Sequence, residues 1–143
     1  MLSFRINNIK TIMSFLFKYG INLLKMLGSF IFAWRGIRIT VKEENNMKVH
    51  AVAAVLVVGI AFFFQISMTD WAILLLVIGM VWTAEIFNSA FERLVDMVSP
   101  DFNPKAGIIK DMAAGAVLVS AIVAVVVGVL IFWKYVEAWV TSW

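Results

Sequence analysis

Residues 71–98 read WAILLLVIGMVWTAEIFNSAFERLVDMV, and this stretch decides the fold class of the chain. None of the fourteen residues before Glu85 is charged, whereas the residues after it keep helical spacing but carry several charges. A helix needs about 20 predominantly apolar residues to cross the hydrocarbon core of a bilayer. The stretch therefore predicts a membrane-spanning helix that continues, still helical, into a polar half near one membrane surface.

Two further apolar segments, about residues 49–68 and 112–133, are each near the length required for a membrane span. Hydrophobic residues make up 63% of the chain and its mean hydropathy is +0.96, whereas soluble domains are nearer half apolar. The pattern predicts an all-α integral membrane protein with three transmembrane helices. Because there is no cysteine and only one histidine, the composition argues against disulfides and against a zinc site.

The distribution of basic residues predicts the orientation in the membrane. Eight of the twelve Lys and Arg residues precede position 50, and others flank a predicted loop at 97–110. A tight turn predicted at 67–70, with the sequence SMTD, contains neither Lys nor Arg. Cytoplasmic loops carry an excess of these residues, so the N-terminus and the 97–110 loop are expected in the cytoplasm and Trp143 outside.

The N-terminal region has a different character. Residues 1–42 are basic and carry apolar residues at helical spacing: Ile12, Phe15, Leu16, Tyr19, Leu23 and Leu27. This pattern suits an amphipathic helix lying in the membrane interface. A disordered targeting tail is the alternative, although the aromatic residues near position 30 argue against it. The expected organisation is an N-terminal extension with an interfacial helix over 1–48 and a three-helix transmembrane domain over 49–143.

One face of the predicted second transmembrane helix is polar. At 100° per residue, four positions fall within about 80° of arc: Glu85, Asn88, Glu92 and Asp96. An ionisable residue within a span costs at least roughly 2.5 kcal/mol unless it is paired or hydrated, so this stripe is expected to face protein or water near the cytoplasmic surface. The alternative is a helix that leaves the membrane after Ala84 as a solvated extension, which accounts for Glu92 better than for Glu85.

Two smaller polar groups precede the other spans. Glu43 and Glu44 come before the first, and Lys110 and Asp111 come before the third. Lys110 either contacts phosphate or sets the membrane topology, and Asp111 either joins it or caps the third helix. The chain has no GxxxxGK[ST] or GxGxxG motif. Any ATP chemistry would therefore depend on carboxylates, Mg²⁺ and a few basic groups, which suffice for phosphoryl transfer.

Three motifs in order resemble the prokaryotic diacylglycerol kinase family, which includes the Gram-positive undecaprenol kinases. They are Glu44-Asn-Asn46 with His50, the sequence EIFNSAFE at 85–92 with Asp96, and KDMAAGAVL at 110–118. The resemblance covers about residues 29–132. It implies a lipid kinase of the bacterial cell membrane that uses ATP and Mg²⁺, and a homotrimer whose sites are shared between protomers. It implies no nucleic-acid partner.

The resemblance also implies roles for individual residues. Glu85 is expected to be the general base and to contact the lipid, and Glu44 and Glu92 are expected to hold Mg²⁺ together with ATP. Ala114 is a further position implied to contact the lipid. The other nucleotide-binding positions that the resemblance implies are Asn88, Lys110, Asp111, Lys25, Phe32, Asp101 and Asn103.

Two questions stay open at the level of sequence. The Glu44-Asn-Asn46 and His50 pattern favours undecaprenol over diacylglycerol as the lipid alcohol. A proton- or ion-translocating subunit is the main alternative function, because Glu85 lies in an apolar helix, but such a protein has no use for Glu44, Lys110 and Asp111 at one membrane face. A third possible function, a packing or adaptor subunit, would not explain the polar stripe.

Overall fold

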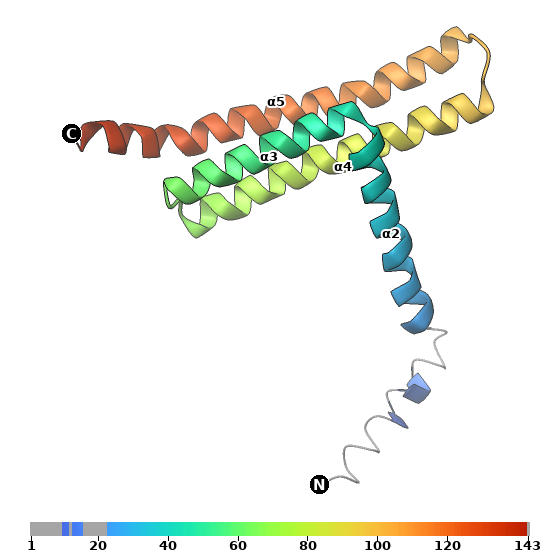
Figure 1. Cartoon of the computed structure of the whole chain (residues 1–143), viewed down its shortest axis with the longest axis horizontal. Helices are drawn as coiled ribbons and strands as arrows, with labels where there is room; N and C mark the ends of the chain where they lie inside the picture. The colour runs from blue at the N-terminus through green and yellow to red at the C-terminus, as the bar shows by residue number, and fades with distance from the viewer. Residues whose placement is uncertain (1–9, 12, 16–22, 143) are drawn as a thin grey trace. The chain divides into compact units, whose positions relative to one another are not determined.

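The computed structural model describes residues 10–11, 13–15 and 23–142, and in this part of the chain all regular structure is helical. The helices are α2 (Leu23–Glu43), α3 (Asn45–Phe63), α4 (Met68–Val98) and α5 (Pro104–Thr141) (Figure 1). The chain forms two compact units, residues 1–38 and 39–143. Ile12, Leu16 and Tyr19, on which the interfacial helix was partly predicted, lie outside the described residues.

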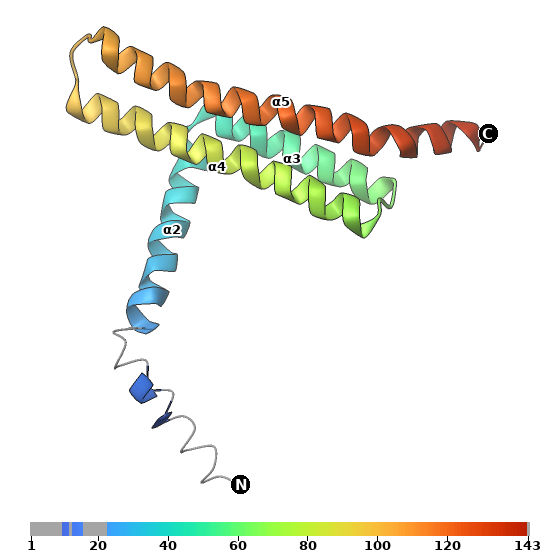
Figure 2. The same ribbon diagram turned by 180° about the vertical axis from the view of Figure 1, so that it is seen from behind.

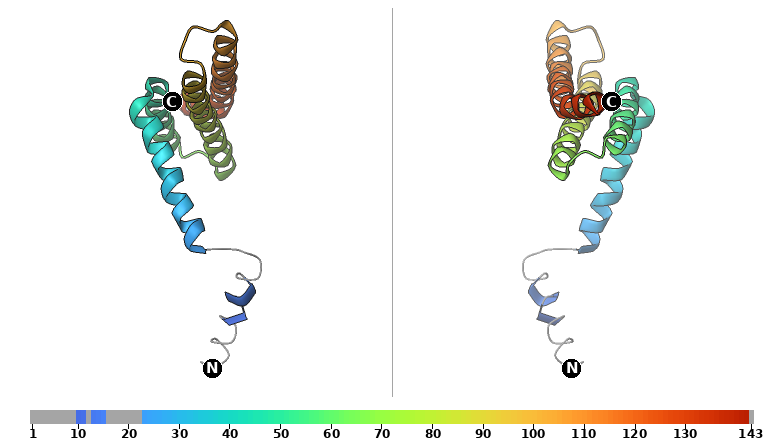
Figure 3. Two further views of the ribbon diagram at one scale, coloured as in Figure 1. Left: turned by 90° about the vertical axis from the view of Figure 1, so that its right-hand side faces the viewer. Right: turned by 90° about the vertical axis from the view of Figure 1, so that its left-hand side faces the viewer.

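Helices α3, α4 and α5 lie side by side, with α4 packed along α5 and α3 packed against α4 (Figures 1 and 2). The two views in Figure 3 show the same arrangement from the sides. Near the α3–α4 turn, a small hydrophobic core joins the three helices: Ala61, Ile66, Leu74 and Ile131 are all buried. Aromatic residues, among them Phe64 and Trp71, pack around this core.

Helices α3, α4 and α5 are each long and apolar enough to span a membrane. Their apolar surface is mostly not covered by the chain itself, since only 11%, 33% and 11% of the residues in the most apolar window of α3, α4 and α5 are buried. Exposed apolar surface of this extent requires lipid or other protein to cover it. The predicted all-α chain with three candidate membrane spans is therefore confirmed.

The first interhelical turn is displaced from its predicted position. Residues 64–67 form the turn, whereas Met68 and Asp70, which were expected within it, belong to the first turn of α4. Ser67 is the N-cap, and its hydroxyl accepts a hydrogen bond from the Asp70 backbone N–H at 3.2 Å. This capping interaction starts the helix earlier than hydropathy alone suggests. The first span, α3, ends at Phe63 and not at Met68, because Phe64 is its C-cap and Gln65 has a positive φ of 50°.

The second loop is shorter than predicted, because α5 begins at Pro104 and not near residue 112. Proline suits the first position of a helix, where its missing N–H is not needed. Asn103 is the N-cap, and its side-chain oxygen accepts from the Lys105 backbone N–H at 3.0 Å. The predicted 97–110 loop is thus reduced to residues 99–103, and Asp111, within the helix, is not a cap.

A buried carboxylate connects the far ends of α4 and α5. Asp70 is only 6% exposed, and its two oxygens accept hydrogen bonds from the Lys134 ammonium at 2.9 Å and the Tyr135 hydroxyl at 2.5 Å. The Ser67 hydroxyl also donates to Asp70, at 2.6 Å. This network fixes the end of α5 against the start of α4.

Candidate functional site

The polar stripe of α4 is buried at Glu85 and Asn88, whereas Glu92 is partly exposed and Asp96 is exposed. Glu85 is 1% exposed, Ser89 3% and Asn88 4%. The Ser89 hydroxyl donates to the Glu85 backbone carbonyl at 2.9 Å, so it is satisfied within its own helix. The burial of Glu85 and Asn88 agrees with the expectation that the stripe faces protein or water, and the solvated alternative does not describe this part of α4.

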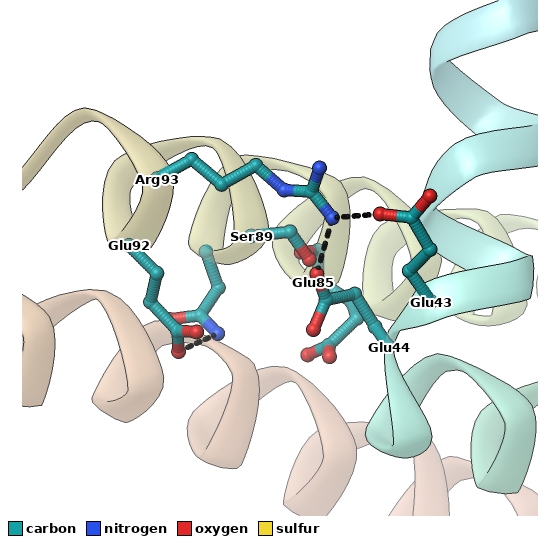
Figure 4. A network of polar contacts seen from close by, with 7 residues as sticks. Glu43, Glu44, Glu85, Ser89, Glu92 and Arg93 are labelled. Atoms are coloured by element: carbon teal, nitrogen blue, oxygen red, sulfur yellow. Dashed lines mark hydrogen bonds and ion pairs between the residues drawn. The ribbon is translucent and has the colours of Figure 1, made fainter. Parts of the chain in front are cut away.

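The junction between α2 and α3 brings two more carboxylates to α4. Figure 4 shows Glu43 and Glu44 facing the α4 segment that carries Glu85, Ser89 and Arg93. A single guanidinium nitrogen of Arg93 donates to Glu44 at 2.7 Å and to Glu43 at 3.1 Å. Glu44 is the N-cap residue of α3, but its side chain makes no capping hydrogen bond. Its carboxylate is therefore directed to Arg93 on the neighbouring helix.

Two buried oxygen atoms on α4 have no hydrogen-bond partner within the described residues: Oε2 of Glu85 and Oδ1 of Asn88. The amide nitrogen of Asn88 donates to Glu92 Oε1 at 2.8 Å, so only the oxygen is left over. Glu85 lies within electrostatic range of His50, Glu92 and Glu44. Buried polar atoms are nearly always paired in proteins. The two unpartnered oxygens of Glu85 and Asn88 on one face of α4 therefore mark a candidate binding site.

A second group lies where α4 and α5 approach the 99–103 loop. The Lys110 ammonium donates to an Asp96 oxygen at 2.5 Å, which joins the end of α4 to the start of α5. Asp111 and Ala114 follow on α5, and both are exposed. This pairing places a cation from α5 beside the polar end of α4.

The remaining predicted site residues are on the surface. Asp101 lies in the loop between α4 and α5, where Asn103 caps α5. Lys25 and Phe32 lie in α2 within the N-terminal unit, and both are exposed.

Arg93 was not predicted as a site residue, because a lone arginine after a polar stripe is usually a solvated surface charge. Its contacts with Glu43 and Glu44 cross 50 and 49 positions of sequence. Glu43 and Glu44 are consecutive acidic residues before α3, and Arg93 is the one basic residue of α4. This pattern was the only signal in the sequence for their contact.

The donor chemistry of this region fits a hard divalent cation. No three His, Cys, Asp or Glu residues of the described chain are grouped closely enough to enclose a metal. Mg²⁺, however, is usually held by one or two carboxylates and completed by phosphate oxygens and water. Glu44 already binds a cationic group in Arg93, and Glu92 supplies a second carboxylate, whose Oε1 accepts from Asn88. Carboxylate oxygens of this kind suit a hydrated Mg²⁺ bound together with a nucleotide.

The fold and this site define a small helical protein with three candidate membrane spans and a group of carboxylates around the buried Glu85. The chain belongs to the prokaryotic diacylglycerol kinase family, whose model matches residues 31–132. The family match gives no support to a proton- or ion-translocating subunit.

Three relatives illustrate the range of the family. The chain is 39% identical to an undecaprenol kinase of Bacillus subtilis (strain 168) over 110 residues, which cover 77% of this chain and 89% of the relative. It is 36% identical to a diacylglycerol kinase of Synechocystis over 104 residues, or 72% of this chain and 59% of the relative. It is 31% identical to the diacylglycerol kinase of Escherichia coli (strain K12), over 73% of this chain and 85% of the relative.

Proposed function

We propose that this protein is an integral-membrane lipid kinase that transfers the γ-phosphoryl group of ATP to a lipid alcohol at the cytoplasmic membrane surface. The observation that carries the proposal is the buried Glu85, whose Oε2 atom has no partner in the described chain. It lies on the same helix as Glu92 and within electrostatic range of Glu44. Membership of the prokaryotic diacylglycerol kinase family and the similarity to lipid kinases support the same reaction.

In the proposed reaction Glu85 is the general base. Its free oxygen accepts the hydroxyl proton of the lipid alcohol while the alcohol oxygen attacks the γ-phosphorus. One oxygen–phosphorus bond forms, the bond between the γ-phosphorus and the bridging oxygen of ATP breaks, and ADP leaves. Phosphoryl transfer depends mainly on positioning and on neutralisation of charge, so the protein needs few further groups.

Glu44 and Glu92 hold Mg²⁺ with the ATP phosphates in this proposal. Bound Mg²⁺ neutralises phosphate charge. Asn88 fixes the Glu92 carboxylate through the hydrogen bond at 2.8 Å. In this proposal Lys110, the cation that pairs with Asp96, contacts phosphate as a compact charge, and Asp111 supports nucleotide binding.

Substrate, assembly and orientation are further parts of the proposal. We propose undecaprenol in preference to diacylglycerol, and the relative with 39% identity, an undecaprenol kinase, supports this choice. A homotrimer with sites shared between protomers would cover part of the exposed apolar surface of the chain. The basic N-terminal region supports a cytoplasmic N-terminus.

One experiment tests the function and the substrate together. Purified protein in lipid nanodiscs is supplied with Mg·ATP and with undecaprenol or diacylglycerol in parallel at equal mole fraction. We expect phosphorylation of both alcohols, with a higher kcat/KM for undecaprenol. A preference for diacylglycerol would reverse the substrate choice, and the absence of product with either alcohol would contradict the kinase proposal.

A further inference from the structure

Trp82 carries a third buried polar atom without a partner. It lies on α4, three residues before Glu85, and its indole Nε1 has no hydrogen-bond acceptor among the described residues. Residues three apart are neighbours on a helix surface. The two residues are therefore neighbours on the surface of α4, and their unpartnered groups are complementary: Nε1 can only donate, whereas an ionised Glu85 can only accept.

Trp82 also lines a cavity of about 430 Å³ between α3, α4 and α5. The cavity walls are almost entirely apolar, with small side chains such as Ala54, Ala124 and Gly128. Because α3 and α4 are antiparallel, Trp82 and His50 line the same end of the cavity, the end toward Glu85, which lies beyond the lining residues. A molecule with a hydrocarbon body and one polar end fits this combination of an apolar cavity and unpartnered polar atoms.

We propose that Trp82 is a substrate-binding residue whose indole N–H donates a hydrogen bond to the hydroxyl oxygen of the lipid alcohol. The inference rests on the proposed kinase function and adds a specificity element to it. A hydroxyl group offers one donor and two acceptor positions. It can give its proton toward Glu85 Oε2 while its oxygen accepts from Trp82 Nε1, which satisfies both unpartnered groups at once.

The substitution Trp82→Phe tests this directly, because it keeps an aromatic ring in the cavity wall and removes only the donor. We expect kcat/KM for the lipid alcohol to fall roughly tenfold, about the value of one lost hydrogen bond in a buried site, with the KM for ATP unchanged. Since Nε1 has no partner among the described residues, the thermal midpoint of Trp82→Phe should not fall.

Trp71→Phe is the matched control. Trp71 lies near the start of the same helix, where its ring packs against Phe62 with centroids 4.8 Å apart. The same chemical change there should leave kcat/KM for the lipid alcohol within about twofold of wild type. A loss in Trp82→Phe no greater than in Trp71→Phe would overturn the inference.

A pair of inhibitors separates hydrogen bonding from packing. The methyl ether of the lipid alcohol can accept from Trp82 but cannot donate to Glu85, and the corresponding hydrocarbon can do neither. At equal mole fraction in the bilayer, we expect wild type to be inhibited more strongly by the ether, and Trp82→Phe to lose this preference. An ether preference that persists in Trp82→Phe would overturn the inference, whereas a wild type inactive on every alcohol would remove the proposed function itself.

Discussion

Arg93 on α4 and Glu44 at the start of α3 form an ion pair at 2.7 Å, and the same guanidinium nitrogen reaches Glu43. This contact holds the α2–α3 junction against the helix that carries Glu85. It also separates the roles of two adjacent carboxylates: the Glu44 side chain is about half as exposed as that of Glu43, at 27% against 54%. Glu44 is thus the carboxylate of the pair that faces the buried site.

The first prediction concerns this pair of glutamates. Because Glu44 is directed toward α4 and is proposed to hold Mg²⁺, Glu44→Gln should raise the Mg²⁺ concentration needed for half-maximal activity several-fold. Glu43→Gln removes the same charge one residue earlier. It should leave the Mg²⁺ concentration for half-maximal activity within twofold of wild type. Nucleotide binding measured calorimetrically at several Mg²⁺ concentrations gives a readout independent of turnover. Equal Mg²⁺ dependence in both variants would assign the metal to other residues.

The second prediction concerns Glu92, whose carboxylate is fixed by the Asn88 amide at 2.8 Å. Glu92→Gln should weaken Mg·ATP binding and raise the KM for ATP, because a ligand of the metal–nucleotide pair is lost. Asn88→Ala should act in the same direction but less strongly, since it frees Glu92 without removing its charge. ATP titrations of both variants in nanodiscs measure this. Wild-type ATP affinity in Glu92→Gln would rule out the assignment.

The third prediction concerns the general base. Glu85→Gln preserves the shape of the side chain but cannot accept a proton. It should assemble and bind Mg·ATP almost as wild type does, yet lose about 10²–10⁴-fold in turnover, the usual range for a general base. Single-turnover measurements with pre-bound Mg·ATP isolate this step from nucleotide binding. Near-normal turnover in a well-folded preparation would place the base elsewhere.

The fourth prediction concerns orientation in the membrane. Eight of the twelve Lys and Arg residues precede position 50, and three spans put the chain ends on opposite sides of the bilayer. The N-terminus should be cytoplasmic and residue 143 external. Reporter fusions active on only one side of the membrane, placed at each end in turn, can check this. Two ends on the same side would contradict a three-span topology.

The fifth prediction concerns the network around Asp70. Asp70→Asn removes the buried charge that accepts from Lys134 and Tyr135 and replaces one accepting oxygen by an amide that donates, so the thermal midpoint should fall. Glu137→Gln on the same end of α5 is the control, since it removes an exposed carboxylate, and its midpoint should stay near that of wild type. Differential scanning fluorimetry in detergent compares them. A midpoint unchanged by Asp70→Asn would show that the network does not stabilise the α4–α5 contact.

The sequence predicted the helices better than it predicted their ends. Hydropathy indicated three spans and the helical continuation past Glu85, but it placed the turns wrongly, at 67–70 and 97–110. The helix starts depend on Ser67 and Asn103, whose side chains cap α4 and α5. Such caps are short-range hydrogen bonds that hydropathy does not register.

Sequence alone determined the features that depend on the order of residues along a single helix. The thickness of a bilayer sets the length of an apolar span, and the helical period of 3.6 residues places Glu85, Asn88 and Glu92 on one face. The contacts of Arg93 with Glu44 and of Asp70 with Lys134 join residues 49 and 64 positions apart. Only the packing of the helices decides which of many compatible charges meet, so only the tertiary structure gave these pairs, the burial of Glu85 and the unpartnered nitrogen of Trp82.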